Sequence, residues 1–518
     1  MLMLSARPLK EILDAMSGKS TEDAALVSSA YEFSAEAHKE QKRYSGDPYF
    51  IHPAEVGYLL ASAGMDAATI CAGLLHDTIE DAGTSAKTIE EKFGTEVLTL
   101  VEGVTKLGAL RYHGMERHTE SLRKLFAATA QDIRVLIIKL MDRLHNVRTL
   151  EHVPRPEKRE RIAHETLEIY APIADRLGMS VVKQELEDAA FRYALPKEYE
   201  KTRELLKERG HENEKRLEKI EKVLKREFAE AGLRTFRTET RIKGVYSLFR
   251  KLERKNWDIT KIYDIIALRV IFPTLAECYA GLGIIHAHWR PVPGKIKDYI
   301  AFPKPNGYQS IHTTVYTGDG SALEMQLRTE AQHREALHGI ASHLSYKEMQ
   351  LEGTRNERRG LEWVRQFFPI LGRTSKPIVE TVRGTKESVP SWVKELAHAH
   401  HEDDESGEYL DRLKADFFSH RVFVFTPKGD VIDLPIAATP IDFAYAVHSD
   451  LGNSMAGARA NGKMVSLDTA LRNGDIVEII TKNSAKPSRK WHDIAKTNMA
   501  KKHIRAALAA DERNKQRK

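Results

Sequence analysis

The chain has 518 residues, of which 42% are hydrophobic and 30% are charged, and this length suggests about three domains with cores of their own. Only two cysteines are present, Cys71 and Cys278, which excludes a disulfide scaffold and a cysteine-based zinc ribbon. No window approaches the roughly 18 apolar residues of a membrane span, and residues 1–8 do not form a signal peptide. We therefore expect a cytoplasmic protein without membrane contact.

The net charge of +6 is small, but basic residues gather in two stretches. Residues 201–255 hold 18 basic and 10 acidic residues, and residues 485–518 hold 11 and 3. Such stretches attract phosphates or nucleic acid. Because basic stretches are often only solvated surface, charge alone favours that second interpretation.

The first part of the chain is predicted to be helical. Apolar residues recur at three- and four-residue spacing through residues 20–195. One helix is expected to begin after Asp66 and to run through Asp77. Residues 197–231 form a charged helical stretch that ends at Gly232 and is interpreted as a connector.

Strand patterns follow. The β-branched, apolar segment Ile262–Phe272 predicts a buried strand. Residues 311–316 and 322–328 flank a Gly-Asp-Gly turn and predict a hairpin, and a helix is expected from Glu330. Residues 235–345 are therefore a mixed α/β unit.

A proline-containing segment, residues 372–418, is interpreted as a partly flexible linker whose three clustered histidines are solvated. A small α/β module follows. It is predicted to contain a hairpin (residues 421–425 and 431–434), a helix from about Pro440 to Ser449 and a last strand, residues 476–480.

The first candidate site is a metal site. His76 and Asp77 are expected in an apolar helix, where a buried His-Asp pair is costly unless it binds metal or pairs with charge. His52 precedes them and Asp142 follows in another helix. Two imidazoles and two carboxylates suit a divalent ion such as Mn²⁺, which lowers the pKa of a bound water. Glu80 is expected on the same helical face as His76, placed to orient or deprotonate that water. The alternative is a satisfied core histidine beside surface acids.

These segments, residues 43–53, 76–81, 103–107 and 142–146, resemble the HD-type phosphohydrolase fold, and most closely the hydrolase domain of the RelA/SpoT homologues. Members of that family make and destroy the alarmone (p)ppGpp. The resemblance implies that Mn²⁺ is held by His52, His76, Asp77 and Asp142, that the attacking water is served by Glu80 and Asp81, and that the nucleotide is contacted by Arg43, Ser45 and Asn146. Position 44 departs from the family, because Tyr44 stands where many relatives have a basic or small residue.

The second candidate site would bind a nucleotide. Basic residues before the α/β unit, among them Arg241, Lys243 and Lys251, suit a triphosphate. Asp264 and Glu324 are expected on separate strands, where they could converge on Mg²⁺. No P-loop motif is present. The alternative is a pair of ordinary strand carboxylates, although an unpaired acid in an apolar strand is expensive.

Residues 293–315 closely resemble the (p)ppGpp synthetase domain of the same family. The resemblance implies transfer of the β,γ-pyrophosphoryl group of ATP to the 3′-hydroxyl of GDP or GTP, with Asp264 and Glu324 on Mg²⁺ and Glu324 helping to deprotonate that hydroxyl. Tyr308 would stack on guanine. Phosphates and adenine would be held by Arg241, Lys243, Lys251, Lys297, Lys304 and His312. Two departures are Lys295, which replaces a common arginine, and Leu344, where many relatives have tryptophan.

Residues 421–482 resemble a TGS domain, with the match carried by residues 439–448. In the family this module senses uncharged tRNA or protein partners, and His448 takes the position that meets the tRNA end. The alternative is a plain surface histidine. Long relatives continue into a cysteine-containing module and an ACT domain, which this sequence lacks, so the chain is expected to be a naturally short member or a cut one.

The expected architecture is multidomain α and α/β. It comprises an all-α HD-type hydrolase domain (residues 1–195), a helical connector (196–233), a mixed α/β nucleotidyltransferase-like synthetase domain (234–371), a linker (372–419), a β-grasp TGS domain (420–483) and a basic tail (484–518). The leading interpretation is a bifunctional (p)ppGpp synthetase and hydrolase. The alternatives are a hydrolase with a weak or inactive synthetase site, and a tRNA- or ribosome-associated regulator in which catalysis is vestigial.

Overall fold

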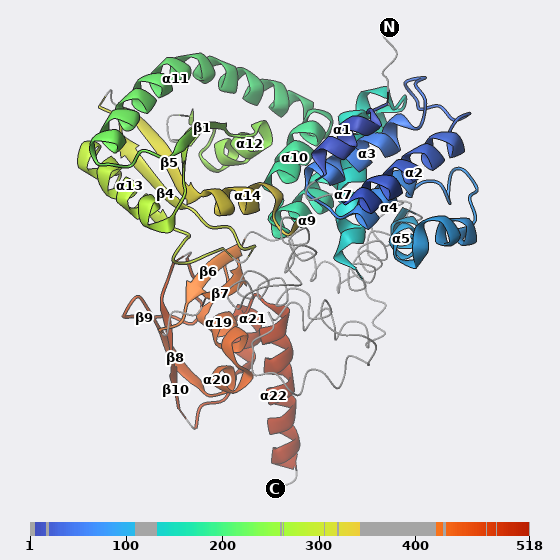
Figure 1. Cartoon of the computed structure of the whole chain (residues 1–518). Coiled ribbons are helices and arrows are strands. Elements are labelled where there is room, and N and C mark those ends of the chain that lie inside the picture. The colour runs from blue at the N-terminus through green and yellow to red at the C-terminus, as the bar shows by residue number, and fades with distance from the viewer. Residues whose placement is uncertain are drawn as a thin grey trace. The chain divides into compact units, whose positions relative to one another are not determined.

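The computed structural model describes residues 6–16, 20–108, 132–259, 262, 264–304, 306–318, 321–341, 421–427, 431–472, 474–482 and 484–516. The chain divides into two compact units, whose described parts lie within residues 6–341 and residues 421–516 (Figure 1). The expected linker, residues 372–419, and Leu344 lie outside the described residues.

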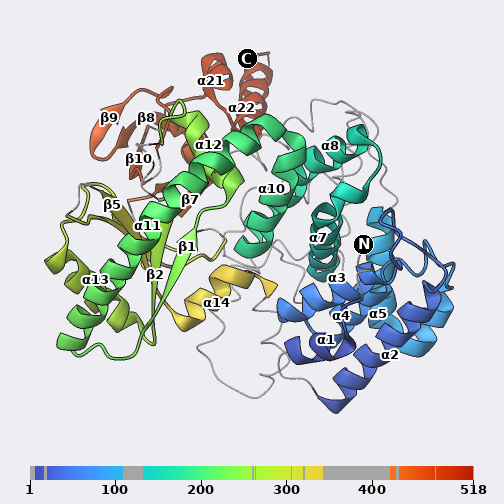
Figure 2. The same ribbon diagram turned by 90° about the horizontal axis from the view of Figure 1, so that it is seen from above.

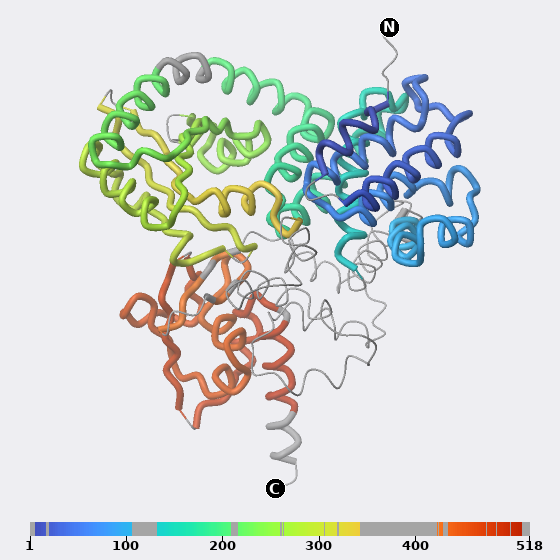
Figure 3. The backbone as a smooth tube through the Cα atoms, in the orientation of Figure 1, coloured from blue at the N-terminus to red at the C-terminus, as the bar shows by residue number. Residues whose placement is uncertain are grey.

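The first unit begins with a helical domain, and Figure 3 follows its backbone from α1 to α10. Its helices are α1 (Leu9–Ala15), α2 (Thr21–Ala37), α3 (Ile51–Ser62), α4 (Ala67–Leu75), α5 (Ala86–Gly108), α7 (Ile133–Arg148), α8 (Pro156–Glu165), α9 (Ala171–Arg176) and α10 (Ser180–Ala194), with a 3₁₀ turn η1 (Leu150–His152) and a π-helical turn η2 (Thr166–Tyr170). The prediction of an all-helical domain is thus confirmed for its described residues.

The side chain of Asp66 caps α4 by accepting a hydrogen bond from the backbone N–H of Thr69 at 2.7 Å.

Close helix packing in this domain follows from small residues. Gly57 on α3 and Gly73 on α4 let the two helices approach, because a Cβ on Gly57 would lie 2.8 Å from Leu74. The predicted end of α4 was wrong, since the helix stops at Leu75 and residues 76–81 continue as turns.

The helix α11 (Pro196–Glu230) leads from this domain to a five-stranded sheet, and Gly232 follows it with a φ of +83°. The sheet has the order β1-β2-β5-β4-β3, in which only the β2–β5 pair is parallel. Its strands and helices are β1 (Arg237–Ile242), α12 (Val245–Arg254), β2 (Ile266–Phe272), α13 (Leu275–His288), β3 (Lys297–Asp298), β4 (Ile311–Tyr316), β5 (Ala322–Thr329) and α14 (Glu330–His338). The predicted hairpin and the helix from Glu330 are confirmed.

The two faces of this sheet differ in polarity. One face carries Leu268, Val270 and Leu327, which join a core with residues of α11 and α13; Figure 2 shows α11 running across the sheet beside α13. Successive side chains of a strand point to opposite faces, and those between the apolar residues are polar. The opposite face of the sheet is therefore polar. On that face Gln326 of β5 stands opposite Arg269 of β2 and His312 of β4.

The second unit contains the predicted small α/β module together with further strands and helices. Its strands form a two-stranded sheet, β6 (Arg421–Phe425) with β7 (Val431–Pro435), and a three-stranded sheet of order β10-β8-β9, namely β10 (Val477–Thr481), β8 (Met455–Ala460) and β9 (Lys463–Val465). The helices are α19 (Pro440–Val447), α20 (Ser449–Asn453), α21 (Arg489–Ile494) and α22 (Asn498–Gln516). The sequence prediction missed β8, β9 and the last two helices.

The prediction of residues 484–518 as only a basic tail was wrong, because helix α22 packs onto α19. Ala500 and Ile504 of α22 are fully buried and share a core with Tyr445 of α19. No helix in the described ranges is long and apolar enough to cross a membrane.

Two candidate active sites

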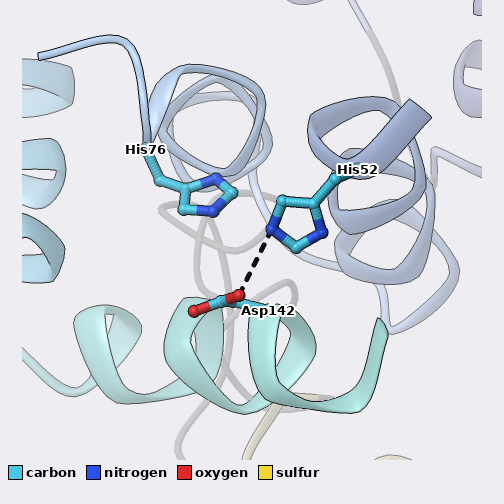
Figure 4. A group of neighbouring side chains, drawn as sticks. All are labelled: His52, His76 and Asp142. Carbon is cyan, nitrogen blue, oxygen red and sulfur yellow. Dashed lines mark ion pairs between the residues drawn. The ribbon is translucent and has the colours of Figure 1, made fainter. Parts of the chain in front are cut away.

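The helical domain brings three of its four predicted metal ligands into one buried group. His52 lies on α3, His76 directly follows α4, and Asp142 lies on α7. One ligand atom from each lies within 4.8 Å of the others, and His52 Nε2 is 3.3 Å from Asp142 Oδ1 (Figure 4). At most 5% of each of these residues is exposed. Three helices therefore converge on one polar point inside an apolar core.

Asp77 borders this group. Its Oδ2 lies 3.2 Å from His76 Nε2 and 3.7 Å from His52 Nε2. His76 Nδ1 bonds to the carbonyl of Gly73 at 2.8 Å, which leaves Nε2 facing the carboxylate, buried and without a hydrogen-bond partner in the part of the chain that the structure describes. A second nitrogen fixed by a backbone carbonyl is typical of metal-binding histidine. This donor set of imidazoles and carboxylates fits a divalent metal ion.

Three residues that the sequence prediction did not include lie beside the candidate metal ligands. The Tyr49 hydroxyl lies 2.8 Å from Asp77 Oδ2, the Lys139 ammonium lies 2.7 Å from Asp142 Oδ2, and His145 Nδ1 lies 2.7 Å from His52 Nδ1. Lys139 and His145 each stand three residues from Asp142 on α7, so helical spacing could have predicted both.

The placement of Glu80 differs from the prediction. It is exposed and lies in the turn after α4, so the argument from a shared helical face was wrong. Partial burial raises the pKa of Glu80, and Asp77 and Asp81 add to that rise while Lys139 opposes it. Glu80 therefore lies within electrostatic reach of the metal group. Asp81 also borders it, because its Oδ2 lies 2.9 Å from the Tyr49 hydroxyl.

Two of the predicted nucleotide contacts meet beside this group. The Arg43 guanidinium donates to Asn146 Oδ1 and to Thr149 Oγ1, both at 3.2 Å, and it lies 3.0 Å from His145 Nδ1. Ser45 lies in the same loop, where its hydroxyl accepts from the backbone N–H of Asp47 at 3.4 Å. Burial lowers the pKa of Arg43, so an anionic ligand would stabilise its charged form.

A second polar centre lies in the sheet-containing domain. Asp264 precedes β2, so its predicted place inside the strand was wrong. Its Oδ2 accepts from the Lys243 ammonium at 2.8 Å and also contacts the Lys251 ammonium. Although burial opposes it, the two lysines hold the pKa of Asp264 well below its usual range. Burial lowers the pKa of Lys243 to about 8. Asp264 is therefore a paired carboxylate, as the argument against an unpaired buried acid requires.

A hydrogen-bonded series crosses the polar face of the sheet from Tyr308 to Glu324. The Tyr308 hydroxyl lies 2.8 Å from His312 Nε2, and His312 Nδ1 lies 3.4 Å from Glu324 Oε1. Gln326 donates to the same carboxylate oxygen at 2.7 Å. Burial raises the pKa of Glu324, but the contacts with His312 outweigh it and bring the pKa to about 2, while the charge of Asp264 acts in the opposite direction. The two carboxylates therefore lie within electrostatic reach of one another.

The other predicted cations border this face. Arg241 lies on β1 opposite Ala267, and Lys297 lies on β3 opposite His312. The Lys304 ammonium lies 4.9 Å from the centre of the Tyr308 ring. Burial lowers the pKa of Lys304 to about 8.

Two further arginines lie on the same face. Arg328 of β5 is only 1% exposed and bonds to His333 Nδ1 at 2.8 Å. Arg269 of β2 lies 3.8 Å from Glu239. The Nε atoms of both arginines are buried and lack a hydrogen-bond partner among the described residues. This excess of buried cations suits a polyanionic ligand.

In the second unit, His448 lies between α19 and α20, with its side chain 67% exposed. Its Nδ1 accepts from the backbone N–H of Asp450 at 3.2 Å. His448 thus caps α20, and its ring remains open to solvent.

One domain holds the group of candidate metal ligands among helices, and the other holds a cation-rich sheet. This combination indicates a protein that joins an HD domain to a RelA/SpoT-type domain. Models of three families match the chain in this order: the HD domain at residues 30–180, the region found in RelA / SpoT proteins at residues 240–351, and the TGS domain at residues 422–481. The chain belongs to the RelA/SpoT family, and the predicted three-part fold is confirmed. HD and RelA/SpoT domains imply the use of divalent metal ions.

Similar proteins carry two names. The guanosine-3′,5′-bis(diphosphate) 3′-pyrophosphohydrolase of Aquifex aeolicus is 44% identical over 98% of this chain and 68% of its own length. The GTP pyrophosphokinase of Myxococcus xanthus is 42% identical over 95% of this chain and 61% of its own length. A solved structure of a metazoan orthologue of SpoT that hydrolyses ppGpp is 27% identical over 34% of this chain and 97% of that chain, with a TM-score of 0.27, which is too low to support an argument. The chain thus spans about 61 to 68% of the length of these two bacterial relatives.

Proposed function

We propose that the chain is a bifunctional, cytoplasmic alarmone enzyme. It would transfer the pyrophosphoryl group of ATP to the 3′-hydroxyl of GDP or GTP, and it would hydrolyse (p)ppGpp to GDP or GTP and pyrophosphate. The observation that carries this proposal is the presence of two separate polar centres in one chain, one in the HD domain and one in the RelA/SpoT region, in a chain whose relatives carry both enzyme names.

For hydrolysis, His52, His76, Asp77 and Asp142 would hold Mn²⁺. The ion would act as a Lewis acid that lowers the pKa of a water molecule. Glu80 and Asp81 would orient that water and accept its proton. The water oxygen would bond to the phosphorus attached to O3′, the bond from that phosphorus to O3′ would break, and the proton would go to O3′.

The nucleotide itself would be held by Arg43, Ser45 and Asn146. The partly buried guanidinium of Arg43 would exchange part of its contact with Asn146 for a contact with the ligand, which favours its cationic form.

For synthesis, Asp264 and Glu324 would hold Mg²⁺, an ion that prefers one or two carboxylates together with substrate phosphates. Glu324 would also accept the proton of the 3′-hydroxyl. O3′ would bond to the β-phosphorus of ATP, the bond between that phosphorus and the α,β-bridging oxygen would break, and AMP would leave with that oxygen. Tyr308 would stack on guanine. Phosphates and adenine would be held by Arg241, Lys243, Lys251, Lys297, Lys304 and His312.

We also propose the domain bounds expected from the sequence, with the tail after residue 483 now assigned to the TGS unit because α22 shares its core. The exposed ring of His448 would meet a tRNA end or a regulatory protein.

The test uses the purified chain in two separate reactions. One contains ATP, GDP and Mg²⁺, and the other contains ppGpp and Mn²⁺. Formation of ppGpp in the first and of GDP in the second is the expected result. Hydrolysis without synthesis would favour the hydrolase alternative, and inactivity in both reactions would contradict the proposal.

A further inference from the structure

Residues 175–180, the end of α9, the start of α10 and the residues between them, are called the turn below and join the helical domain to the loop that carries Tyr308. The carbonyl of Asp175 accepts a hydrogen bond from Asn306 Nδ2 at 2.9 Å. The carbonyl of Leu177 accepts from the backbone N–H of Ile340 at 2.9 Å. Main-chain groups of the helical domain are therefore bonded to two separate segments of the sheet-containing domain.

Two glycines make this contact unusually close. Gly178 has a φ of +71° and Gly339 has a φ of +59°, a region that favours glycine. A Cβ on Gly339 would overlap the carbonyl of Leu177 and would lie 2.7 Å from Met179 N. A Cβ on Gly178 would lie 3.1 Å from the carbonyl oxygen of Asn306. Backbone faces backbone here, so the contact cannot relax by rotation of a side chain.

The bonded loop is the one with the nucleotide candidates. Asn306 Oδ1 accepts from the backbone N–H of Tyr308 at 3.3 Å. Gly307 N donates to Lys304 O at 2.8 Å, and Lys304 N donates to Tyr308 O at 3.1 Å. The loop thus closes on itself, and its bond to Asp175 fixes it to the helical domain.

Charge adds to this arrangement. The Asp175 carboxylate pairs with the Lys183 ammonium at 2.9 Å, and its negative charge favours the charged form of buried Lys304. The same turn therefore contacts the loop through its backbone and acts on one of its cations through space.

We propose that the turn of residues 175–180 is a positioning element of the synthetase site, which sets the place of Tyr308 and hence the affinity for the guanine nucleotide. This inference rests on the proposed synthetase function. Hydrolysis does not use the loop, so opening the contact affects GDP binding and leaves ppGpp hydrolysis in place.

The test compares three single substitutions in the full chain. Gly339→Ala places a methyl group against the backbone of the turn, and Gly178→Ala does so less severely. Gly232→Ala is the matched control, because Gly232 also has a positive φ but no atom of the described residues lies within 4 Å of its Cβ position. The control therefore tests a side chain at positive φ without the clash.

Calorimetric titration with GDP and steady-state synthesis kinetics measure the effect. We expect Gly339→Ala to weaken GDP binding and to raise the KM for GDP about tenfold, with a smaller change in kcat. Gly178→Ala is expected to give a smaller shift and Gly232→Ala none, and ppGpp hydrolysis is expected to stay within about twofold in all three.

Three outcomes would overturn the proposal. Unchanged GDP affinity in both Gly339→Ala and Gly178→Ala would show that the turn does not position the loop. An equal loss of ppGpp hydrolysis and of GDP binding would show that the turn only holds the two domains together. Failure of the unaltered chain to bind GDP or to make ppGpp would contradict the synthetase function itself, and hydrolysis by the same sample would separate that outcome from a misfolded protein.

Discussion

Tyr49 places one hydroxyl group between two carboxylates, Asp77 and Asp81, at 2.8 and 2.9 Å. A phenol carries one proton and can donate it to only one of them at a time. Burial and both acids raise the pKa of Tyr49 above its usual range, so the hydroxyl remains a donor at neutral pH. Tyr49 thus links a candidate metal ligand to a candidate for the water-orienting acid.

We predict that Tyr49→Phe lowers the kcat of ppGpp hydrolysis about 10- to 100-fold, because the link between Asp77 and Asp81 is lost. Synthesis from ATP and GDP should be unchanged. Tyr31→Phe is the control, because the Tyr31 hydroxyl donates to the carbonyl of Arg7, away from the candidate metal ligands. Equal hydrolysis by Tyr49→Phe and the unaltered chain would exclude a positioning role for Tyr49.

Glu187 on α10 is a buried acid at the contact with α12, where its Oε2 accepts from Ser247 at 3.2 Å. Burial raises its pKa from 4.5 to about 7, and Lys183 opposes the rise. A raised pKa in the folded state means that stability is fully present below about pH 4.5 and is lost as the pH rises toward 7. Above pH 7 the cost of the buried charge is constant.

We therefore predict that Glu187→Gln stabilises the chain at pH 8 by about 1 to 3 kcal/mol and has little effect near pH 4.5. Glutamine keeps an acceptor for Ser247 and removes the charge. Thermal or urea unfolding at the two pH values measures the difference. A stabilisation of equal size at both pH values would contradict the assignment of the pKa shift to Glu187.

At the scale of elements, periodicity and turn residues predicted most of the fold. The strand β4 is rich in β-branched residues, the apolar residues of β5 alternate with polar ones, and a glycine turn lies between the two strands in the sequence. The strand β8, with the sequence Met-Ala-Gly-Ala-Arg-Ala, has weak β propensity and forms because β10 pairs with it. The prediction of α4 through Asp77 failed because no glycine or proline marks its end at Leu75.

The helix α22 could have been predicted. Ala500, Ile504 and Leu508 recur every four residues, the spacing of one helical face, but the basic charge of the segment dominated the interpretation. A single buried acid ties this segment to the TGS module. Asp442 is fully buried, and its carboxylate accepts backbone N–H groups from Lys496 at 2.9 Å and Thr497 at 2.7 Å.

We predict that Asp442→Asn destabilises the second unit by about 2 to 4 kcal/mol. The NH2 group of asparagine would replace one carboxylate oxygen and would face N–H donors that need an acceptor. Asp450→Asn is the control, since the Asp450 side chain is 87% exposed. Hydrogen exchange of residues 484–516 reports the change. Protection equal to that of the unaltered chain would show that the apolar contacts of α22 suffice.

At the scale of the whole molecule, three residues that the sequence proposed as metal ligands lie together, whereas their surroundings were not predicted. His52, His76 and Asp142 could be chosen because a buried acid or histidine in an apolar helix needs a partner. Their meeting point depends on how α3, α4 and α7 pack, which no local pattern encodes. For the same reason Tyr49, Arg269 and the glycine contact between the domains were not predicted.

The central claim is that one chain holds two independent active sites. Its most direct test measures both reactions in two variants. Asp77→Ala should lose bound Mn²⁺ and ppGpp hydrolysis and keep synthesis, because it removes a candidate ligand of the helical site only. Asp264→Gly should lose synthesis and keep hydrolysis, because phosphate charge at the sheet site would go uncompensated, at a cost of several kcal/mol. Near-normal hydrolysis by Asp77→Ala, persistent synthesis by Asp264→Gly, or loss of both reactions in either variant would contradict the account.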